Sequence, residues 1–247
     1  MVGALVGVGG AALLGAAGYQ SMAPTGQWYG RTFVGLSRGS KQIALTYDDG
    51  PNDPHTLRLL EILAKHEATA TFFLIGRFLG QRAAIAREIV KAGHAIGNHT
   101  FTHPNLIFAG QGETRSQLER CQRAIGDAVG LAPVLFRPPF GGRRPGTLAI
   151  ARSLGLTPIM WSITGYDWNA PPADRIVARV SGKIRGGDVV LLHDGSHLAM
   201  GGDRAQTVIA SDRLIASWKA EGYRFVGVPE MLQDGGLGSV STAGQGN

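Results

Sequence analysis

The fold is decided by residues 42–51, QIALTYDDGP, an apolar β-like run that ends in two adjacent carboxylates and a Gly-Pro turn. Residues 42–47 have the composition of a strand. They are followed by helical periodicity over residues 54–65 and by a β-branched and aromatic run over residues 69–75. Strand, helix and strand in this order are typical of parallel strands joined by crossover helices. The stretch therefore predicts an α/β domain.

The same alternation continues along the chain to about residue 232. Asp53 and Pro54 form an N-cap and N1 pair for the first helix, and Gly93 and Gly130 are placed to end two later ones. The sequence predicts further helices over 81–92, 113–129, 172–184 and 204–220 and from about 145, and further strands over 94–97, 133–136, 156–163, 188–192 and 223–226. About seven β/α units, without a fixed-period repeat or an internal linker, predict one distorted (β/α)7–8 barrel.

Composition agrees with one folded domain. The 247 residues are 44% hydrophobic and 17% charged, which is enough to bury a sizeable core. The formal charge of +6 is not gathered in a dense basic run, so we expect no nucleic-acid partner. The single Cys121 excludes an intrachain disulfide and a thiolate metal cluster, and its helical spacing with Leu118 and Ile125 predicts a buried position. The oligomeric state is open, with a monomer favoured.

The two ends of the chain differ from its middle. Residues 2–19 are uncharged but short and Gly-rich, so they match neither a span of about 20 apolar residues nor a signal peptide with a basic start. Membrane association or export is favoured over a flexible start; residues 21–23 (Ser-Met-Ala) could be a cleavage site, although Pro24 counts against it. The predicted division is an apolar segment and lead-in over 1–40, the barrel domain over 41–232, and a Gly/Ser-rich disordered tail over 233–247.

Polar clusters follow several of the predicted strands. Asp48 and Asp49 come at the end of the first strand, where neighbouring side chains point in different directions. One carboxylate could therefore bind a metal while the other faces a water molecule. Taken alone, Asp-Asp-Gly-Pro is equally an ordinary turn sequence.

The second and third clusters carry imidazoles and a guanidinium. His99 and His103 are spaced i and i+4, close enough on a helical turn to bind one ion. With one carboxylate they would form a two-His, one-Asp site with open positions. Arg137, in Arg-Pro-Pro-Phe-Gly, is a permanent cation available to pair with a carboxylate.

The last two clusters have ordinary alternatives. Asp167 could cap a helix or turn, Trp168 could be a core residue, and His193 could be a buried histidine with satisfied nitrogens. However, the carboxyl ends of barrel strands meet at one mouth. Five polar clusters that each follow a different strand therefore predict one shared site.

Together, the motifs TYDDGP, HTFTH, RPPFG, YDW and LLH resemble those of the polysaccharide deacetylase family, the NodB-homology or carbohydrate esterase family 4 enzymes. They occur in the family's order over about residues 41–232. Each motif is weak alone, but the ordered set is specific. The resemblance implies a NodB-type barrel and a metal-dependent hydrolase that removes N-acetyl groups from amino-sugar glycans. Peptidoglycan, chitin-like oligomers and poly-N-acetylglucosamine are candidate substrates, and a cell-envelope or secreted location follows.

The resemblance also implies a metal site and a general base. Asp49, His99 and His103 would bind one divalent ion, usually zinc, with cobalt or nickel as alternatives. Asp48 would be the general base that activates the attacking water. Arg137 would hold its carboxylate in the charged form beside Asp49.

The remaining implied roles concern the acid and the substrate pocket. His193 would be the general acid that protonates the departing sugar amine, oriented by Asp167. The backbone N–H of Phe140 would stabilise the oxyanion. Trp168 and Leu191 would line the pocket for the acetyl methyl group.

The chain departs from the family pattern in two places. Residues 161–164 (WSIT) replace acidic residues that many relatives carry before the Asp-Trp element, which predicts altered substrate contacts. Tyr47 replaces a phenylalanine, and the sequence indicates no role for its hydroxyl. The other four histidines match no motif and are expected at the surface or at caps, with His197 the candidate for a place near the cleft: His55, His66, His94 and His197.

Two alternatives stand beside an active deacetylase. One is a catalytically silent glycan-binding protein on the same fold, against which the complete set of ligands, acid and base argues. The other is an enzyme that acts on a different small amide, such as a lipid-linked formamido sugar. Selection among glycans is expected in the loops over 108–113 and 194–204, which match no motif.

Overall fold

The computed structural model describes residues 15–236, and its central strand is β1 (Gln42–Gly50). Eight of the nine residues of β1 are buried, and it pairs in parallel with β2 (Ala70–Leu74) and β7 (Asp188–His193), which are buried throughout. Strands buried on both faces carry nearly continuous apolar runs, as these do.

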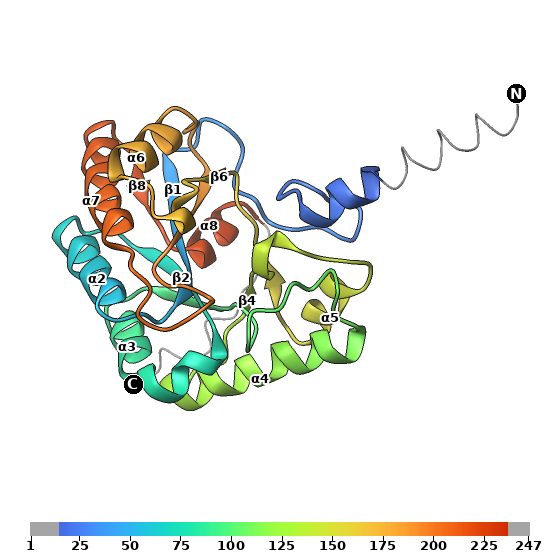
Figure 1. Cartoon of the computed structure of the whole chain (residues 1–247). Coiled ribbons are helices and arrows are strands. Elements are labelled where there is room, and N and C mark those ends of the chain that lie inside the picture. Colours follow the sequence, from blue (N-terminus) through green and yellow to red (C-terminus); the bar gives the residue numbers. More distant parts are fainter. Residues whose placement is uncertain (1–14, 237–247) are drawn as a thin grey trace, which may run out of the picture.

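The sheet is curled and open between its two edge strands. Its order is β5-β4-β3-β2-β1-β7-β6, with β8 paired to the start of β1, and these pairings are all parallel (Figure 1). The remaining strands are β3 (Ala95–Asn98), β4 (Leu135–Phe136), β5 (Thr157–Pro158), β6 (Ile163–Thr164) and β8 (Arg224–Phe225). This confirms the predicted α/β class and the distorted barrel.

The single strand predicted over residues 156–163 is wrong. The run divides into β5 at one edge of the sheet and β6 at the other, and residues 159–162 cross the opening between them. Pro158 lacks a donor for continued pairing. The backbone carbonyls of Ile159 and Met160 instead accept hydrogen bonds from the Arg137 guanidinium, at 3.4 and 3.0 Å.

Residues 33–36, here called the strap, fill the opening. Phe33 pairs in parallel with Ile159 next to β5, and Gly35 pairs antiparallel with Asp188, the first residue of β7. Backbone hydrogen bonds of 2.7 to 3.0 Å support both contacts, and Phe33 is buried. The strap thus joins the two edges of the sheet.

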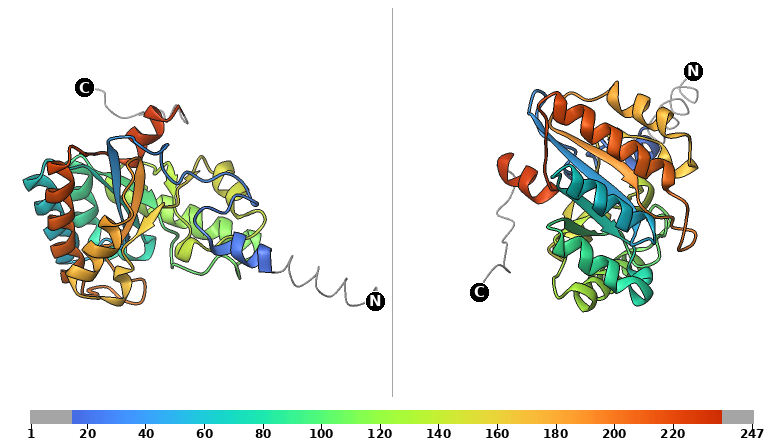
Figure 2. Two further views of the ribbon diagram at one scale, coloured as in Figure 1. Left: turned by 90° about the horizontal axis from the view of Figure 1, so that it is seen from above. Right: turned by 90° about the vertical axis from the view of Figure 1, so that its left-hand side faces the viewer.

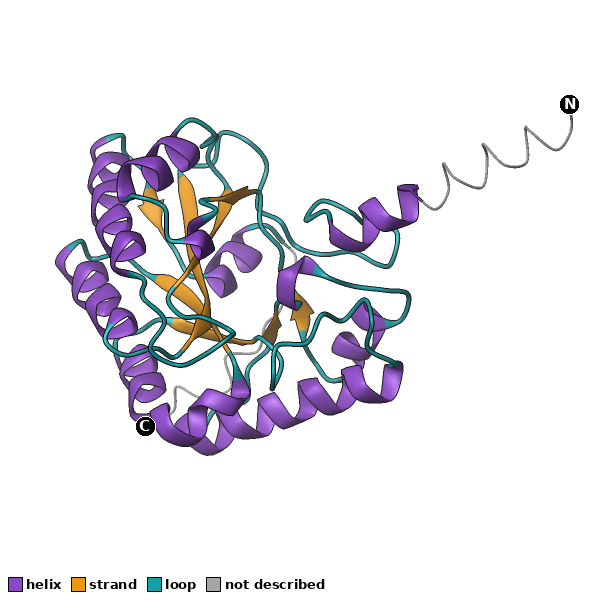
Figure 3. Cartoon of the chain, viewed as in Figure 1, coloured by secondary structure: helices purple, strands orange, loops and turns teal. Residues whose placement is uncertain are grey.

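Helices surround the outer face of the sheet (Figures 2 and 3). They are α2 (His55–Lys65), α3 (Gly76–Lys91), α4 (Gln111–Val129), α5 (Thr147–Ser153), α6 (Ala173–Ser181) and α7 (Ala205–Ala220). The helix α8 (Val228–Asp234) instead packs with the residues inside the barrel. The predicted helices lie within about two residues of the observed bounds, apart from one different N-cap and two larger differences. Pro54 rather than Asp53 occupies the N-cap of α2, α3 begins five residues before its predicted start across a kink at Arg82, and α6 ends three residues before its predicted end. The sequence did not predict α8.

Alternation along β1 separates two cores. Ile43, Leu45 and Tyr47 pack against the helices, whereas Ala44 belongs to a second cluster inside the barrel. The strap and α8 contribute to that inner cluster, and Cys121 is fully buried in the outer one, as predicted.

The segment that precedes the strap begins with a helix over residues 15–22, which lies on the side of the molecule that holds α5 (Figures 1 and 2). Most of the apolar segment 2–19 and of the tail 233–247 lies outside the described residues, so those predictions stay predictions. Among residues 15–236, we find no helix with the length and apolar character needed to cross a membrane.

Candidate active site

Two adjacent carboxylates reach the same barrel mouth because β1 is irregular at its end. Asp48 follows the inward alternation of Ala44, and a regular strand would turn Asp49 to the opposite face. Instead, Asp49 adopts a left-handed φ of 74°, and the register between β1 and β2 shifts between Asp48 and Gly50. Bulges of this kind re-aim a side chain. Both carboxylates therefore line one pocket.

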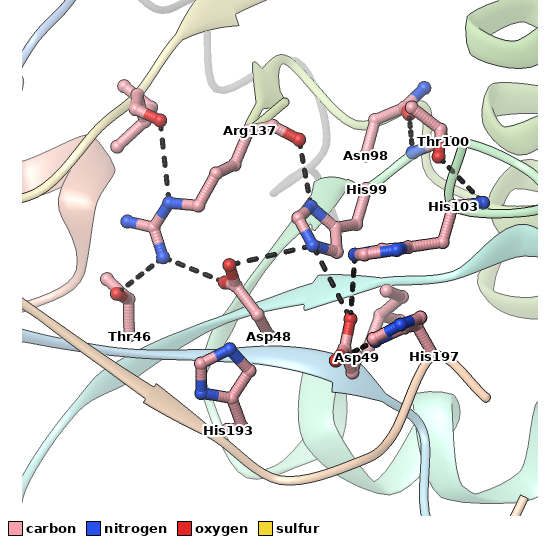
Figure 4. A network of polar contacts seen from close by, with 12 residues as sticks. Thr46, Asp48, Asp49, Asn98, His99, Thr100, His103, Arg137, His193 and His197 are labelled. Atoms are coloured by element: carbon pink, nitrogen blue, oxygen red, sulfur yellow. Dashed lines mark hydrogen bonds and ion pairs between the residues drawn. The ribbon is translucent and has the colours of Figure 1, made fainter. Parts of the chain in front are cut away.

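Asp49, His99 and His103 form a buried cluster whose candidate ligand atoms all lie within 4.8 Å of one another (Figure 4). Asp49 Oδ1 is 3.1 Å from His103 Nε2 and 3.6 Å from His99 Nε2. This oxygen is buried and has no hydrogen-bond partner among the described residues. A buried oxygen that converges with two imidazole nitrogens fits a divalent cation, for which one carboxylate and two imidazoles are a suitable donor set.

The protonation states suit metal binding. His99 Nδ1 lies 2.8 Å from the backbone carbonyl of Arg137, so a proton on Nδ1 leaves the Nε2 lone pair directed at Asp49. Burial, only partly opposed by Asp48, lowers the pKa of His99 to about 4, and the ring is neutral at pH 7. Burial alone would raise the pKa of Asp49. Contacts with His103 and His197 outweigh it and hold that pKa well below its ordinary value.

The two histidines of this cluster do not lie on a helical turn, so that part of the prediction is wrong. Residues 99–103 form an irregular loop in which Thr100 and His103 have left-handed φ angles of 66° and 64°. The Asn98 side chain accepts a bond from Thr100 N–H (2.9 Å), and the Thr100 hydroxyl accepts one from His103 N–H (3.1 Å). These bonds direct both imidazoles at Asp49 without a helix.

Asp48 is held by a buried cation. Arg137 Nη1 donates to Asp48 Oδ1 at 2.8 Å and to the Thr46 hydroxyl at 2.7 Å, and the Arg137 side chain is fully buried. Burial lowers the pKa of Arg137 and the Asp48 carboxylate opposes that shift; a guanidinium remains charged. Asp48 Oδ2 lies 3.6 Å from His99 Nε2, on the side of the Asp49/His99/His103 cluster.

His193 and Asp167 form a second buried pair, and His193 lies next to Asp48 because the two residues are register partners on β7 and β1. His193 Nδ1 lies 2.8 Å from Asp167 Oδ1, and the Asp167 carboxylate also accepts bonds from the His193 backbone N–H and the Thr207 hydroxyl, both at 2.8 Å. Burial lowers the pKa of His193, but Asp167, with smaller contributions from Asp49 and Asp48, raises it to about 9. The imidazole is therefore protonated at neutral pH.

A pocket of about 500 Å³ joins these groups. Phe140, Trp168 and Leu191, the three residues predicted to contact substrate, all line it. The Trp168 ring lies edge-on to His193 with centroids 5.6 Å apart. Phe140 has a left-handed φ of 58°, and its N–H has no acceptor among the described residues, whereas the next two N–H groups donate to carbonyls of the same turn. The Phe140 N–H is thus free to bind an oxygen atom.

Several further residues reach the pocket without having been assigned a role. His197 Nδ1 is 3.6 Å from Asp49 Oδ2, and its ring stacks on His103 with centroids 4.5 Å apart. It belongs to the loop over 194–204, which lines the pocket as expected, whereas none of the described residues 108–113 does. The sequence made His197 a candidate for a place near the cleft but indicated no role for it, because it matches no motif. Met22 also lines the pocket, and no motif pointed to it.

The expectation for two other histidines is wrong. His55 and His94 are buried rather than exposed, and neither caps a helix through its side chain. His94 packs against the ring of Phe72, and His66 contacts Asp212 at 2.6 Å. His66 is also the C-cap residue of α2, in agreement with the prediction, and none of these three histidines lines the pocket.

Comparisons with known proteins identify the class that this fold and site define. A family model described as "Polysaccharide deacetylase" matches residues 36–159. The chitooligosaccharide deacetylase of Azorhizobium caulinodans is 36% identical and covers 78% of this chain and 96% of its own. The peptidoglycan-N-acetylglucosamine deacetylase of Bacillus cereus is also 36% identical, over 78% of this chain and 68% of its own. The chain belongs to the polysaccharide deacetylase family.

Among solved structures, a pseudoenzyme of carbohydrate esterase family 4 from Bacillus anthracis superposes with a TM-score of 0.75 at 33% identity. The match covers 82% of this chain and 69% of the other. Members of one fold family thus include a protein described as inactive, and activity has to be argued from the side chains of each chain.

Proposed function

We propose that this protein is a metal-dependent N-deacetylase of amino-sugar glycans, acting in the cell envelope or outside the cell. The observation that carries the proposal is the convergence of three groups on one pocket. They are the Asp49/His99/His103 cluster, the Asp48 carboxylate held by Arg137, and the His193–Asp167 pair. Relatives named for chitooligosaccharide and peptidoglycan deacetylation support an acetamido sugar as the substrate.

Asp49, His99 and His103 would hold one divalent ion, with zinc favoured and cobalt or nickel as alternatives. When bound, such an ion acts as a Lewis acid on a carbonyl oxygen and lowers the pKa of water.

The chain's own groups divide the proton transfers. Asp48 takes a proton from the water whose oxygen attacks the acetamide carbon, and Arg137 keeps the carboxylate from turning away. The Phe140 N–H donates to the carbonyl oxygen as negative charge develops on it. His193 Nε2 gives its proton to the sugar nitrogen as the C–N bond breaks, because Nδ1 is engaged by Asp167. The products are acetate and a free amine.

The shape of the pocket favours a small acyl group. Leu191 and Trp168 flank His193, so a methyl group directed at them would leave the amide nitrogen near the general acid. The silent glycan-binding alternative has weaker support, because a protein that only bound sugar would not need a buried cation to hold Asp48 or a buried carboxylate to orient His193.

The test uses metal-stripped protein and N-acetylglucosamine oligomers. Readdition of a divalent ion should restore acetate release, and Asp48→Asn should lose roughly 10²- to 10⁴-fold in kcat while still binding metal. Asp53→Asn, a change at an exposed carboxylate just beyond the same turn, is the matched control and should keep the parent rate. Normal turnover by Asp48→Asn would refute its role as the base. Release of formate from an N-formylated amino sugar, with no acetate released from the N-acetylated oligomers, would favour the deformylase alternative.

A further inference from the structure

The segment over residues 21–26, here called the N-terminal wall, is fastened to the loop that carries Phe140. Arg143 is 1% exposed, and its Nη2 donates to the carbonyls of Ala23 (2.6 Å) and Gly26 (2.7 Å). The Arg143 backbone N–H also donates to the Ser21 carbonyl at 3.0 Å. A buried guanidinium needs such acceptors, because burial of an unpaired cation is costly. The contact between Arg143 and the N-terminal wall is therefore an integral part of the fold.

The N-terminal wall also holds its own shape. The Gln20 side-chain oxygen accepts hydrogen bonds from the backbone N–H groups of Gln27 (2.9 Å) and Trp28 (3.3 Å), which folds the chain back on itself. A Cβ atom added at Gly26 would lie 2.7 Å from both the Gln20 oxygen and Arg143 Nη2, so only glycine permits this close approach.

This fastening places Met22 at the pocket. Met22 lines it together with Phe140 and Trp161, and the Met22 carbonyl lies 3.2 Å from where a Cβ of Gly141 would be. The residue is 42% exposed, so its apolar surface is available to a ligand. Methionine is a flexible apolar side chain suited to irregular binding surfaces.

The N-terminal wall precedes the part of the chain that matches the family model, which begins at residue 36. The catalytic groups lie at or beyond residue 48, whereas Met22 comes from a segment outside the matched part. We infer that Met22 is a specificity-determining residue, presented by the N-terminal wall, that contacts the glycan next to the reacting sugar. This inference rests on the proposed function.

One consequence concerns the Ser-Met-Ala sequence over residues 21–23. A chain cleaved after Ala23 would lose Met22 and the Ser21 carbonyl that Arg143 N–H binds. The N-terminal wall therefore requires a chain that is continuous through Ala23. An active protein found by mass spectrometry to begin at Pro24 would overturn the inference.

A labelling experiment tests the contact directly. Cys121, the single native cysteine, is buried, so a cysteine introduced by Met22→Cys can be alkylated selectively. In metal-loaded protein that also carries Asp48→Asn, an N-acetylglucosamine oligomer at about ten times its KM should slow this alkylation by about tenfold, as mass action predicts for a shielded site. Tyr19→Cys is the control: Tyr19 is 62% exposed, belongs to the same helix and does not line the pocket. Its alkylation rate should not change.

Kinetics of the full chain provide the second measurement. Met22→Ala should raise KM for the oligomer by roughly tenfold with little change in kcat, the pattern for loss of binding shared by ground and transition states. Met22→Leu should restore most of the affinity, and Tyr19→Ala should match the parent. If Met22→Ala unfolds at the same midpoint as the parent, its higher KM reflects a lost substrate contact and not a loss of stability.

The outcomes distinguish the two proposals. Parent protein that releases no acetate from any N-acetylated glycan refutes the proposed function. Active parent protein in which the Met22 and Tyr19 variants behave alike, in both alkylation and KM, refutes the role of Met22 alone.

Discussion

Asp48 and His193 lie side by side on the paired strands β1 and β7 and line one pocket, yet their neighbours suit them to opposite proton transfers. Asp48 is paired with a guanidinium that is fully buried, and His193 is paired with a carboxylate that is fully buried. Hydrolysis of an amide requires a base for the water and an acid for the amine, because an unprotonated amine is a poor leaving group. The charge of the buried neighbour thus supports the role that we propose for each side chain.

Asp167→Asn should move the basic limb of the pH profile. The Asp167 carboxylate opposes the effect of burial and raises the pKa of His193 to about 9, and loss of an adjacent opposite charge lowers a pKa by roughly 1–3 units. Because the acid must be protonated, activity declines as pH rises through this pKa, and the variant should decline at lower pH. The measurement is kcat/KM against pH for metal-loaded parent and variant.

Thr207→Val is the matched control, since it removes the hydroxyl that donates to Asp167 Oδ2 but leaves the charge in place. Its basic limb should stay close to that of the parent. A basic limb for Asp167→Asn that coincides with the parent's would show that His193 is not the general acid.

For single residues, the sequence predicts which side chains reach the pocket when those residues lie at the ends of strands. Asp48 and His193 sit at or just after strand ends, and parallel strands bring such positions to one mouth whatever the connections between them. His197 and Met22 are different, because their positions depend on the path of a loop and on the packing of a chain end. Neither path has a periodicity that a sequence displays.

The elements illustrate why boundaries and turns are harder to predict. The pair His99 and His103 has helical spacing, but side-chain bonds from Asn98 and Thr100 compete with helical hydrogen bonding and fix a loop. The apolar run over 156–163 has the composition of one strand. Two backbone carbonyls of this run accept hydrogen bonds from the buried Arg137 guanidinium, and a sequence pattern cannot show such a contact.

Tyr47, for whose hydroxyl the sequence indicated no role, connects β1 to α7. Its hydroxyl lies 2.9 Å from the Ser211 hydroxyl in a fully buried position, and its ring stacks on Phe72. Tyr47→Phe should lower the free energy of unfolding by about 1–3 kcal/mol, because the Ser211 hydroxyl remains buried without its partner.

Urea unfolding of a double-mutant cycle checks this. Adding Ser211→Ala to Tyr47→Phe should recover part of the loss, since no polar group is then left unpaired. Acetate release should be the same in all variants. Strictly additive losses would mean that the two hydroxyls do not interact.

For the whole molecule, the strap is what joins the two edges of the open sheet. Gly35 has a φ of 140°, and a Cβ atom there would lie 2.4 Å from the Gly187 carbonyl oxygen. Gly35→Ala should therefore displace the strap and destabilise the protein more than Gly39→Ala, which also replaces a glycine of positive φ but meets no neighbouring atom within 4 Å.

The Gly39→Ala cost should be of the order of 1–3 kcal/mol from backbone strain alone, and the Gly35→Ala cost should exceed it. Thermal unfolding of both variants beside the parent provides the comparison. Equal unfolding midpoints for the two variants would show that contact of the strap with Gly187 contributes nothing to stability.

The barrel class follows from alternating strands and helices, because that order leaves parallel pairing with outer helices as the natural arrangement. The strap does not follow from it. Its partners, Ile159 and Asp188, are far away along the chain, and four residues carry too short a pattern to indicate pairing.

The strap also determines when, during synthesis of the chain, the barrel can be completed. Residue 35 leaves the ribosome about 150 residues before its partner Asp188, an interval of roughly 8 to 30 seconds at ordinary rates of synthesis. Throughout this time neither the opening nor the inner core that Phe33 helps to fill can be completed. The strap is synthesised early but can pair with β7 only after Asp188 has been made, so the two edges of the sheet stay unjoined in the nascent protein until then.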